Sequence, residues 1–247
     1  MKKDIQLIAL DMDGTLLRND HSVSEENREA IKTAQEQGKA VMVSTGRPLL
    51  YAEKIVDSLN LSTYLITVNG GEIWSPERTL IERTIIDSSH VEFMLDMALK
   101  HDTHYWSSTV EGVFNKNTTF PKNIYDFQWL KFGFDIKDDD VRELIWNELS
   151  MREELEVTNS SMTNIEVNAA GINKAAAIRK VCKRLNISMD EVMAVGDSLN
   201  DLAMIKESGI GVAMENAQPK VKEAADWVTH SNEDHGVAEA IRRFVLK

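Results

Sequence analysis

A short apolar segment, residues 5–10, leads directly into the acidic sequence Asp11-Met12-Asp13-Gly14. An apolar run of this length that ends in a turn is typical of a strand buried on both faces of a parallel sheet. Similar runs occur at residues 40–44 and 192–195, and stretches long enough for helices separate them. This alternation of strand and helix predicts an α/β fold with a doubly wound, mostly parallel sheet.

The strand–helix alternation is interrupted in the middle of the chain. Residues 82–170 contain short alternating segments, two predicted helices near 89–100 and 138–149, and three of the five tryptophans. The alternation returns at residue 171 with a predicted helix over 173–185. We therefore expect a core domain formed by residues 1–81 and 171–247, with residues 82–170 inserted as a separate α+β domain.

Composition narrows the possible partners and location. The chain carries 40 acidic and 28 basic residues, a formal net charge of -12, which argues against general nucleic-acid binding. No run of about 18 apolar residues is present, so no membrane span is expected. The single cysteine, Cys182, excludes an intrachain disulfide and suits a reducing compartment. We expect a soluble, cytoplasmic protein, and nothing in the sequence indicates an obligate protein partner.

The strongest candidate for a functional motif is the acidic sequence after the first strand. Residues just beyond the carboxyl end of a strand line the ligand crevice of an open parallel sheet. Asp11 and Asp13 can both face one site if the loop turns, which Gly14 allows. One alternative is a turn with a helix-capping aspartate. A calcium loop is a second alternative, but Leu16 would then occupy a liganding position, and a strand rather than a helix precedes the motif.

A second group of polar residues follows the strand at 192–195. Asp197, Asn200 and Asp201 can supply oxygen ligands for a hard cation at the same sheet edge, although a simple helix cap at Asp197 would explain this motif by itself. Thr45 and Gly46 place a hydroxyl and backbone N–H groups at a helix start, where anions bind.

Lys174 begins the predicted helix after the insert, and a lone lysine there is usually solvated. Its combination with carboxylates, a hydroxyl and backbone donors at several strand ends is more specific, and it predicts a phosphate and metal site.

These motifs, with residues 44–48, 68–73 and 211–217, make the chain resemble the haloacid dehalogenase-type phosphatases, specifically the Cof-like branch with a large inserted cap. The resemblance covers residues 4–80 and 171–247. The chain departs from the family pattern at Ala175 and Glu215, where glycine is usual. Neither change removes a catalytic group, but Glu215 changes the rim of the expected site.

The resemblance implies a Mg²⁺-dependent phosphatase acting on a small phosphomonoester, such as a sugar phosphate or a cofactor precursor. Asp11 is expected to attack phosphorus and form an aspartyl-phosphate. Asp13 is expected to protonate the leaving group and then activate water. Mg²⁺ is expected to be held by Asp11, the Asp13 backbone carbonyl and Asp197.

The resemblance also implies roles for the other polar residues. Asp201 is expected to orient metal-bound water or Lys174, and Arg47 either contacts substrate or forms a salt bridge at the helix start. The Asn69-Gly70 turn resembles a family turn near the site, but a tight hairpin explains it equally well. Phosphate contacts are implied for the Met12 N–H, Thr45, Gly46, Lys174 and Asn200.

Two other functions remain open at this point. A phosphomutase or other phosphotransferase of the same superfamily would use the same nucleophile. A non-catalytic phospho-ligand sensor is disfavoured because it has no use for Asp13. The insert is expected to select the leaving group, with its tryptophans in a core rather than a substrate platform. His101 and His104 lack an obvious third ligand for a metal site.

Overall fold

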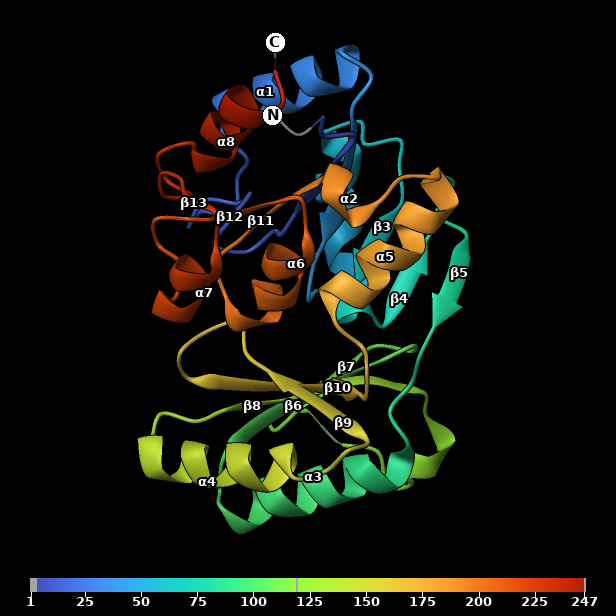
Figure 1. Ribbon diagram of the computed structural model, residues 1–247. Coiled ribbons are helices and arrows are strands. Elements are labelled where there is room, and N and C mark those ends of the chain that lie inside the picture. The colour runs from blue at the N-terminus through green and yellow to red at the C-terminus, as the bar shows by residue number, and fades with distance from the viewer. Residues whose placement is uncertain (1–3, 119, 247) are drawn as a thin grey trace. The chain divides into compact units, whose positions relative to one another are not determined.

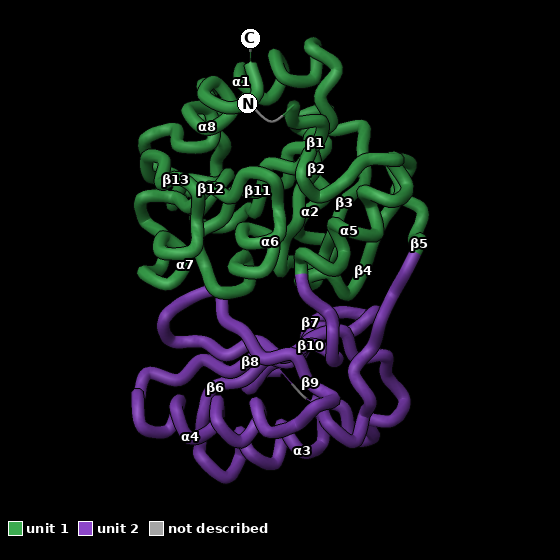
Figure 2. Tube along the Cα trace, viewed as in Figure 1, with its two compact units in different colours: residues 1–81, 174–247 green, residues 82–173 purple. Residues whose placement is uncertain are grey.

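The computed structural model describes residues 4–118 and 120–246 and contains two compact units (Figure 1, Figure 2). Unit 1 comprises Met1–Ile81 and Lys174–Lys247, and unit 2 comprises Glu82–Asn173. The second division falls at 173/174, whereas the sequence placed it at 170/171. Residues 1–3 and 247 of the expected core domain, and residue 119 of the expected insert, lie outside the described residues.

Unit 1 is built on an eight-stranded sheet. Its order is β13 (Trp227–Val228), β12 (Ile210–Ala213), β11 (Val192–Gly196), β1 (Leu7–Leu10), β2 (Ala40–Ser44), β3 (Leu65–Thr67), β4 (Glu72–Trp74) and β5 (Leu80–Arg83). Neighbouring strands from β13 to β3 are parallel, and β3 pairs with β4 as an antiparallel hairpin. The expected α/β fold with a mostly parallel sheet is confirmed.

Helices cover both faces of this sheet because successive strand residues point to opposite sides. In β1, Ile8 and Leu10 belong to the core that includes α1 (Glu25–Glu36), α2 (Leu49–Ser58) and α8 (Gly236–Phe244). Leu7 and Ala9 belong to a second core, formed with α5 (Lys174–Leu185) (Figure 1). Two shorter helices, α6 (Leu202–Glu207) and α7 (Pro219–Ala224), follow β11 and β12.

Local signals fix where these elements begin and end. The Ser24 side chain accepts the Asn27 N–H and caps α1. Residues 199–201 form a 3₁₀ turn, η4 (Leu199–Asp201), before α6 begins. The turn between β3 and β4 is also 3₁₀, η1 (Val68–Gly70), with Asn69 in the left-handed region at φ 58°. The Asn69-Gly70 turn therefore closes the β3–β4 hairpin.

Unit 2 contains a five-stranded antiparallel sheet. Its order is β7 (Val113–Asn115), β6 (His104–Thr109), β8 (Trp129–Asp135), β10 (Asn164–Ala169) and β9 (Leu155–Thr158). Helices α3 (Ser88–Lys100) and α4 (Asp139–Ser150) lie on the same side of it (Figure 1). Phe132, Phe134, Ile165 and Val167 from the sheet share one apolar core with residues of both helices.

Three further observations concern single residues and the lengths of the helices. Trp129 is fully buried in the unit 2 core, as expected for a core tryptophan. Cys182 is buried on α5. Within residues 4–118 and 120–246, every helix is too short or too polar to cross a membrane.

Candidate active site

The parallel strands of unit 1 bring distant motifs to one sheet edge. β1 pairs with β2 and β11 so that Leu10 lies opposite Val43 and Val195. The residue after Leu10 is Asp11, whose N–H donates to the Val195 carbonyl at 3.0 Å. The carboxyl ends of the three strands therefore meet at one sheet edge, which is where open parallel sheets form their ligand crevices.

Three carboxylates and one ammonium group form the centre of this edge. Oxygens of Asp11, Asp197 and Asp201 all lie within 4.8 Å of one another. Lys174, the first residue of α5, is fully buried, and its Nζ lies 2.6 Å from Asp11 Oδ1 and 2.6 Å from Asp201 Oδ1. The formal charge of these four side chains, with all of them ionised, is negative. This set of hard oxygen donors suits a divalent cation.

The protonation equilibria reflect this excess of negative charge. Burial raises the pKa of Asp11 well above its usual range, and the nearby Asp201 carboxylate raises it further. Burial, followed by Asp201, raises the pKa of Asp197 to about 7. Burial by itself lowers the pKa of Lys174, but the Asp11 and Asp201 carboxylates outweigh it, so the pKa is raised. A bound cation fits this site because it would compensate the carboxylates that Lys174 alone does not neutralise.

Asp201 is held in place by its own contacts. Its Oδ1 accepts from Lys174, and its Oδ2 accepts the N–H groups of Asp197 and Ser198 at 3.0 and 3.1 Å. A Cβ at Gly196 would lie 2.4 Å from Asp201 Cγ, so only glycine leaves room for this side chain. These contacts favour the expected role of Asp201 in orienting Lys174, which stays a prediction.

Asp197 is bonded on both carboxylate oxygens. The Thr15 hydroxyl donates to Oδ1 at 3.3 Å, and the Ser198 hydroxyl donates to Oδ2 at 3.0 Å. Gly14 has a φ of +76°, and a Cβ there would lie 2.5 Å from Asp197 Oδ2. Sequence reasoning missed Thr15 and Ser198 as site residues. Their position beside Asp13–Gly14 and Asp197 was the available signal.

Asp13 lies apart from the carboxylate cluster. Its side chain is 49% exposed and bonds to Arg47 through Nε at 2.8 Å and Nη2 at 2.5 Å. The bond to Asp13 raises the pKa of the Arg47 guanidinium. Of the two alternatives for Arg47, the structure contains the salt bridge, and its partner is the residue expected to act as acid and base.

The remaining expected phosphate contacts follow β1, β2 and β11. Thr45 is buried, and its hydroxyl oxygen accepts the Arg47 N–H at 3.1 Å. Its carbonyl accepts the Asn69 N–H at 3.0 Å, and the Asn69 side chain accepts from Asn200 Nδ2 at 3.3 Å. Asn69 thus joins two expected site residues, which agrees with the resemblance of the Asn69-Gly70 turn to a family turn near the site.

Met12 and Gly46 enter this region through the backbone. The Met12 side chain is buried in the core of unit 1, and its carbonyl accepts the Leu17 N–H at 2.8 Å. Gly46 is half-buried between Thr45 and Arg47. Their contacts with phosphate stay predictions.

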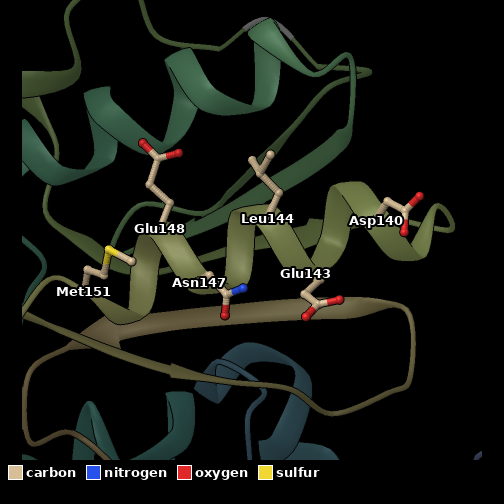
Figure 3. Close-up of a pocket in the computed structure, with 6 residues that line it drawn as sticks. All are labelled: Asp140, Glu143, Leu144, Asn147, Glu148 and Met151. Atoms are coloured by element: carbon tan, nitrogen blue, oxygen red, sulfur yellow. The ribbon is translucent and has the colours of Figure 1, made fainter.

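In the described parts of the chain, Asp11, Asp197 and Asp201 form the one group of His, Cys, Asp or Glu side chains close enough to hold a metal ion, so His101 and His104 belong to no such group there. A hollow of about 510 Å³ lies along one face of α4 in unit 2, and Figure 3 shows the side chains that line it. The side chains come from α4 and from the residue that directly follows it, and they include three carboxylates but none of the expected catalytic residues. They are Asp140, Glu143, Leu144, Asn147, Glu148 and Met151.

Comparison with known proteins adds independent information. Residues 8–241 match a family model described as haloacid dehalogenase-like hydrolase. The chain is 55% identical to the 5-amino-6-(5-phospho-D-ribitylamino)uracil phosphatase YcsE of Bacillus subtilis (strain 168), over 98% of this chain and 97% of the relative. It is 30% identical to a phosphoglycolate phosphatase of Methanobrevibacter smithii, over 98% and 100% of the two chains.

Solved structures give the same result for the fold. A haloacid dehalogenase-like hydrolase from B. subtilis superposes with a TM-score of 0.89 at 28% identity, covering 98% of this chain and all of the other.

Proposed function

The chain belongs to the haloacid dehalogenase-like hydrolases and is a phosphatase, and we propose that it hydrolyses a small phosphomonoester through an aspartyl-phosphate on Asp11. Family membership confirms the resemblance read from the motifs. The observation that carries the mechanism is the buried Asp11 carboxylate, which lies 2.6 Å from the Lys174 ammonium and beside Asp197. A carboxylate can attack a phosphate only where nearby positive charge offsets the repulsion between the two anions.

We propose 5-amino-6-(5-phospho-D-ribitylamino)uracil as the substrate. The support is the relative named for that activity, which is 55% identical along nearly the whole of both chains. The relative named for phosphoglycolate is only 30% identical at similar coverage, so the first resemblance carries the assignment. The alternatives of phosphotransferase and sensor are not favoured, because both of these relatives are named phosphatases.

The proposed reaction has two steps. Asp11 forms a bond from its carboxylate oxygen to phosphorus while the ester P–O bond breaks, and Asp13 gives its proton to the leaving alkoxide. Asp13 then removes a proton from a water molecule that attacks phosphorus, which releases inorganic phosphate and restores Asp11. Lys174 stabilises the charge on Asp11 and on the transferring group, and Arg47 orients Asp13 through its two hydrogen bonds.

Mg²⁺ is the proposed cation. Asp11, Asp197 and the Asp13 backbone carbonyl would hold it, and the cluster of carboxylates with raised pKa values supports such a site. When bound, it supplies positive charge close to the phosphoryl oxygens. The Met12 and Gly46 N–H groups, the Thr45 hydroxyl and the Asn200 amide are proposed to bind the phosphoryl oxygens from the protein side.

We also propose that the protein acts in the cytoplasm on a free metabolite. The support is chemical: the one cysteine, Cys182, is a buried thiol, and burial raises its pKa to about 11. Such a thiol is unreactive and needs no oxidising compartment.

The test measures phosphate release from p-nitrophenyl phosphate with Mg²⁺ and with excess chelator. We expect turnover only with Mg²⁺, and none above background for Asp11→Asn. The neutral amide also removes a buried carboxylate whose charge is unfavourable, so the variant should unfold at the same or a higher temperature. Asp96→Asn, an exposed aspartate on α3, is the matched control and should leave activity unchanged. Turnover by Asp11→Asn would remove Asp11 as the nucleophile.

A further inference from the structure

The turn between β3 and β4 has a backbone conformation that is rare for one of its residues. Val68 and Asn69 both lie in the left-handed region, at φ 53° and 58°, and Gly70 follows at φ 104°. Asparagine and glycine adopt such a backbone readily, but it is an outlier for a β-branched residue such as valine. Backbone strain of this kind persists only where the surrounding contacts fix it, and it is concentrated at functional sites. The contacts that hold η1 in this conformation therefore indicate what the turn does.

Two backbone N–H groups of η1 hold the loop that follows β2. The Val68 N–H donates to the Arg47 carbonyl at 3.1 Å, and the Asn69 N–H donates to the Thr45 carbonyl at 3.0 Å. Regular pairing of β2 with β3 has ended before these residues, so the two bonds continue the attachment past the end of the strand. The left-handed turn thus fixes the backbone on both sides of Gly46, whose N–H is a proposed phosphate donor.

The Asn69 side chain reaches another segment, the loop after β11. Its Oδ1 accepts a hydrogen bond from Asn200 Nδ2 at 3.3 Å, and the two residues are 2% and 8% exposed. Within the residues that the structure describes, Asn200 Oδ1 is buried and has no hydrogen-bond partner. The bond to Asn69 is therefore the hydrogen bond that orients the Asn200 amide.

The orientation of this amide matters because Asn200 is proposed to bind a phosphoryl oxygen. Its Nδ2 carries two hydrogens, so one can go to Asn69 while the other is left for the ligand. An amide that is free to rotate must lose that freedom when phosphate binds, and it can present its carbonyl oxygen instead of its N–H group. Since a phosphate oxygen gains no hydrogen bond from a carbonyl oxygen, an orientation set before binding adds to the affinity.

We propose that Asn69 is a positioning residue for the phosphate-binding part of the site. Its backbone N–H fixes the Thr45 backbone and its side chain fixes the Asn200 amide, so one residue sets two donors that come from different loops. All of these residues belong to unit 1. Asn69 acts through them and not by contact with the substrate. This inference rests on the proposed function, because that function assigns phosphate binding to Thr45 and Asn200.

A simpler explanation of Asn69 is that asparagine tolerates a left-handed backbone. Asn69→Gly separates the two explanations, because glycine keeps the backbone conformation and removes the side-chain acceptor. Asn60→Gly is the matched control, since Asn60 also has a left-handed backbone, at φ 52°, but is exposed and follows the carboxyl end of α2. Asn200→Ala and the double variant N69G/N200A complete a double-mutant cycle.

The experiment uses the full-length protein with Mg²⁺ and measures hydrolysis of p-nitrophenyl phosphate and its inhibition by inorganic phosphate. We expect Asn69→Gly to raise the inhibition constant of phosphate about 3- to 10-fold and to lower kcat/KM by a similar factor, as for the loss of one neutral hydrogen bond. The affinity for Mg²⁺, from isothermal titration, should not change, because Asn69 is not among the carboxylates of the cation site. Asn60→Gly should match the wild type, and thermal unfolding establishes that each variant is folded.

The double variant distinguishes positioning from general support of the fold. If Asn69 acts through Asn200, N69G/N200A should have nearly the same phosphate inhibition constant as Asn200→Ala alone. A purely structural role predicts instead that the two losses multiply, and that result overturns the proposal. If Asn69→Gly does not fold, Asn69→Ser takes its place in the cycle with the same expectations, because a serine hydroxyl is too short to reach the Asn200 amide.

Other outcomes separate the role of Asn69 from the proposed function. A loss of phosphate affinity in Asn200→Ala without any loss in Asn69→Gly overturns only the role of Asn69. If Asn200→Ala binds phosphate as tightly as the wild type, Asn200 is not a phosphate ligand, and the positioning role of Asn69 is overturned with it. A wild-type protein that releases no phosphate from p-nitrophenyl phosphate contradicts the proposed function itself.

Discussion

Asp11 and Asp13 are two residues apart in sequence, yet their carboxylates have opposite surroundings. Asp11 is buried and bonded to an ammonium group, which fits a nucleophile that must be free of water. Asp13 is half exposed and bonded to Arg47, which fits a group that must exchange protons with a leaving group and with water. The difference in surroundings assigns different chemistry to identical side chains.

Arg47→Lys tests whether Arg47 positions Asp13. A lysine keeps the positive charge but cannot donate two parallel hydrogen bonds from a planar group, so Asp13 loses its fixed orientation. We expect kcat to fall about 10- to 100-fold with little change in KM, together with an altered pH–rate profile. Steady-state kinetics across pH measures both effects.

Arg78→Lys is the matched control, since Arg78 pairs with the exposed Asp57 carboxylate of the same unit. It should behave as the wild type. A rise in KM without loss of kcat in Arg47→Lys would instead place Arg47 on the substrate.

At the residue scale, motifs predict which side chains belong to the site more reliably than they predict the contacts that those side chains make. Asp11, Lys174 and Asp197 were predicted to converge because each follows a strand end or starts a helix at that edge, and the structure brings them together. The bond between Asp13 and Arg47 was not predicted as such. Both side chains are long or exposed enough to take several orientations, and only the three-dimensional arrangement selects one.

At the scale of secondary-structure elements, the site depends on loops that approach closely after β1 and β11. Gly14, in the loop after β1, permits the Asp197 carboxylate of the β11 loop to approach its backbone. A side chain at this position would meet that carboxylate directly. The glycine therefore joins two elements that are far apart in sequence.

Gly14→Ala should lower the affinity for Mg²⁺ strongly and lower the stability of the folded protein only modestly. The positive φ costs about 1–2 kcal/mol for an L-residue, and the new Cβ displaces the Asp197 carboxylate. Isothermal titration with Mg²⁺ and thermal unfolding measure the two effects.

Gly38→Ala is the matched control, because its φ is +79° but nothing lies within 4 Å of the added Cβ. The two variants should lose similar stability, and only Gly14→Ala should lose Mg²⁺ affinity. Equal Mg²⁺ affinities would contradict the argument.

Elements of unit 1 were easier to predict than those of unit 2. A strand buried on both faces is a continuous apolar run, as in β1 and β11, and it is visible in sequence. In unit 2 the sheet has one polar face, and Lys131 and Gly133 interrupt the apolar pattern of β8. A register shift between Ser108 and Thr109 disturbs the alternation further. Most of these strands were therefore not predicted individually.

At the scale of the whole molecule, the carboxylate cluster links folding to pH. In the metal-free protein the pKa of Asp197 is raised to about 7, against about 3.9 in an unfolded chain. Between these values the native state keeps a proton that the unfolded state has lost. Its stability therefore falls as pH rises through this window, and the raised pKa of Asp11 acts in the same direction.

Bound Mg²⁺ should restore the stability that the protein loses as pH rises, because the cation compensates the carboxylate charges that protons compensate at lower pH. We expect millimolar MgCl₂ to raise the Tm more at pH 8 than at pH 5, since at pH 5 the cation must first displace protons. Differential scanning calorimetry at both pH values measures the effect. Asp197→Asn should have a smaller Mg²⁺ response at pH 8. Equal gains in Tm at pH 5 and pH 8 would refute this linkage.

The division of the chain between Asn173 and Lys174 has a consequence for how such enzymes diversify. The residue that neutralises the nucleophile is the first one after the insert, joined to it by a single peptide bond. Exchange of the whole insert among relatives therefore leaves the site intact only if the chain is rejoined on the insert side of this bond. A residue gained or lost within the first turn of α5 would turn Lys174 by about 100° relative to the packed body of the helix and carry the ammonium group away from Asp11. A length change in the turn before Lys174 leaves the packed helix, and with it the ammonium group, in place.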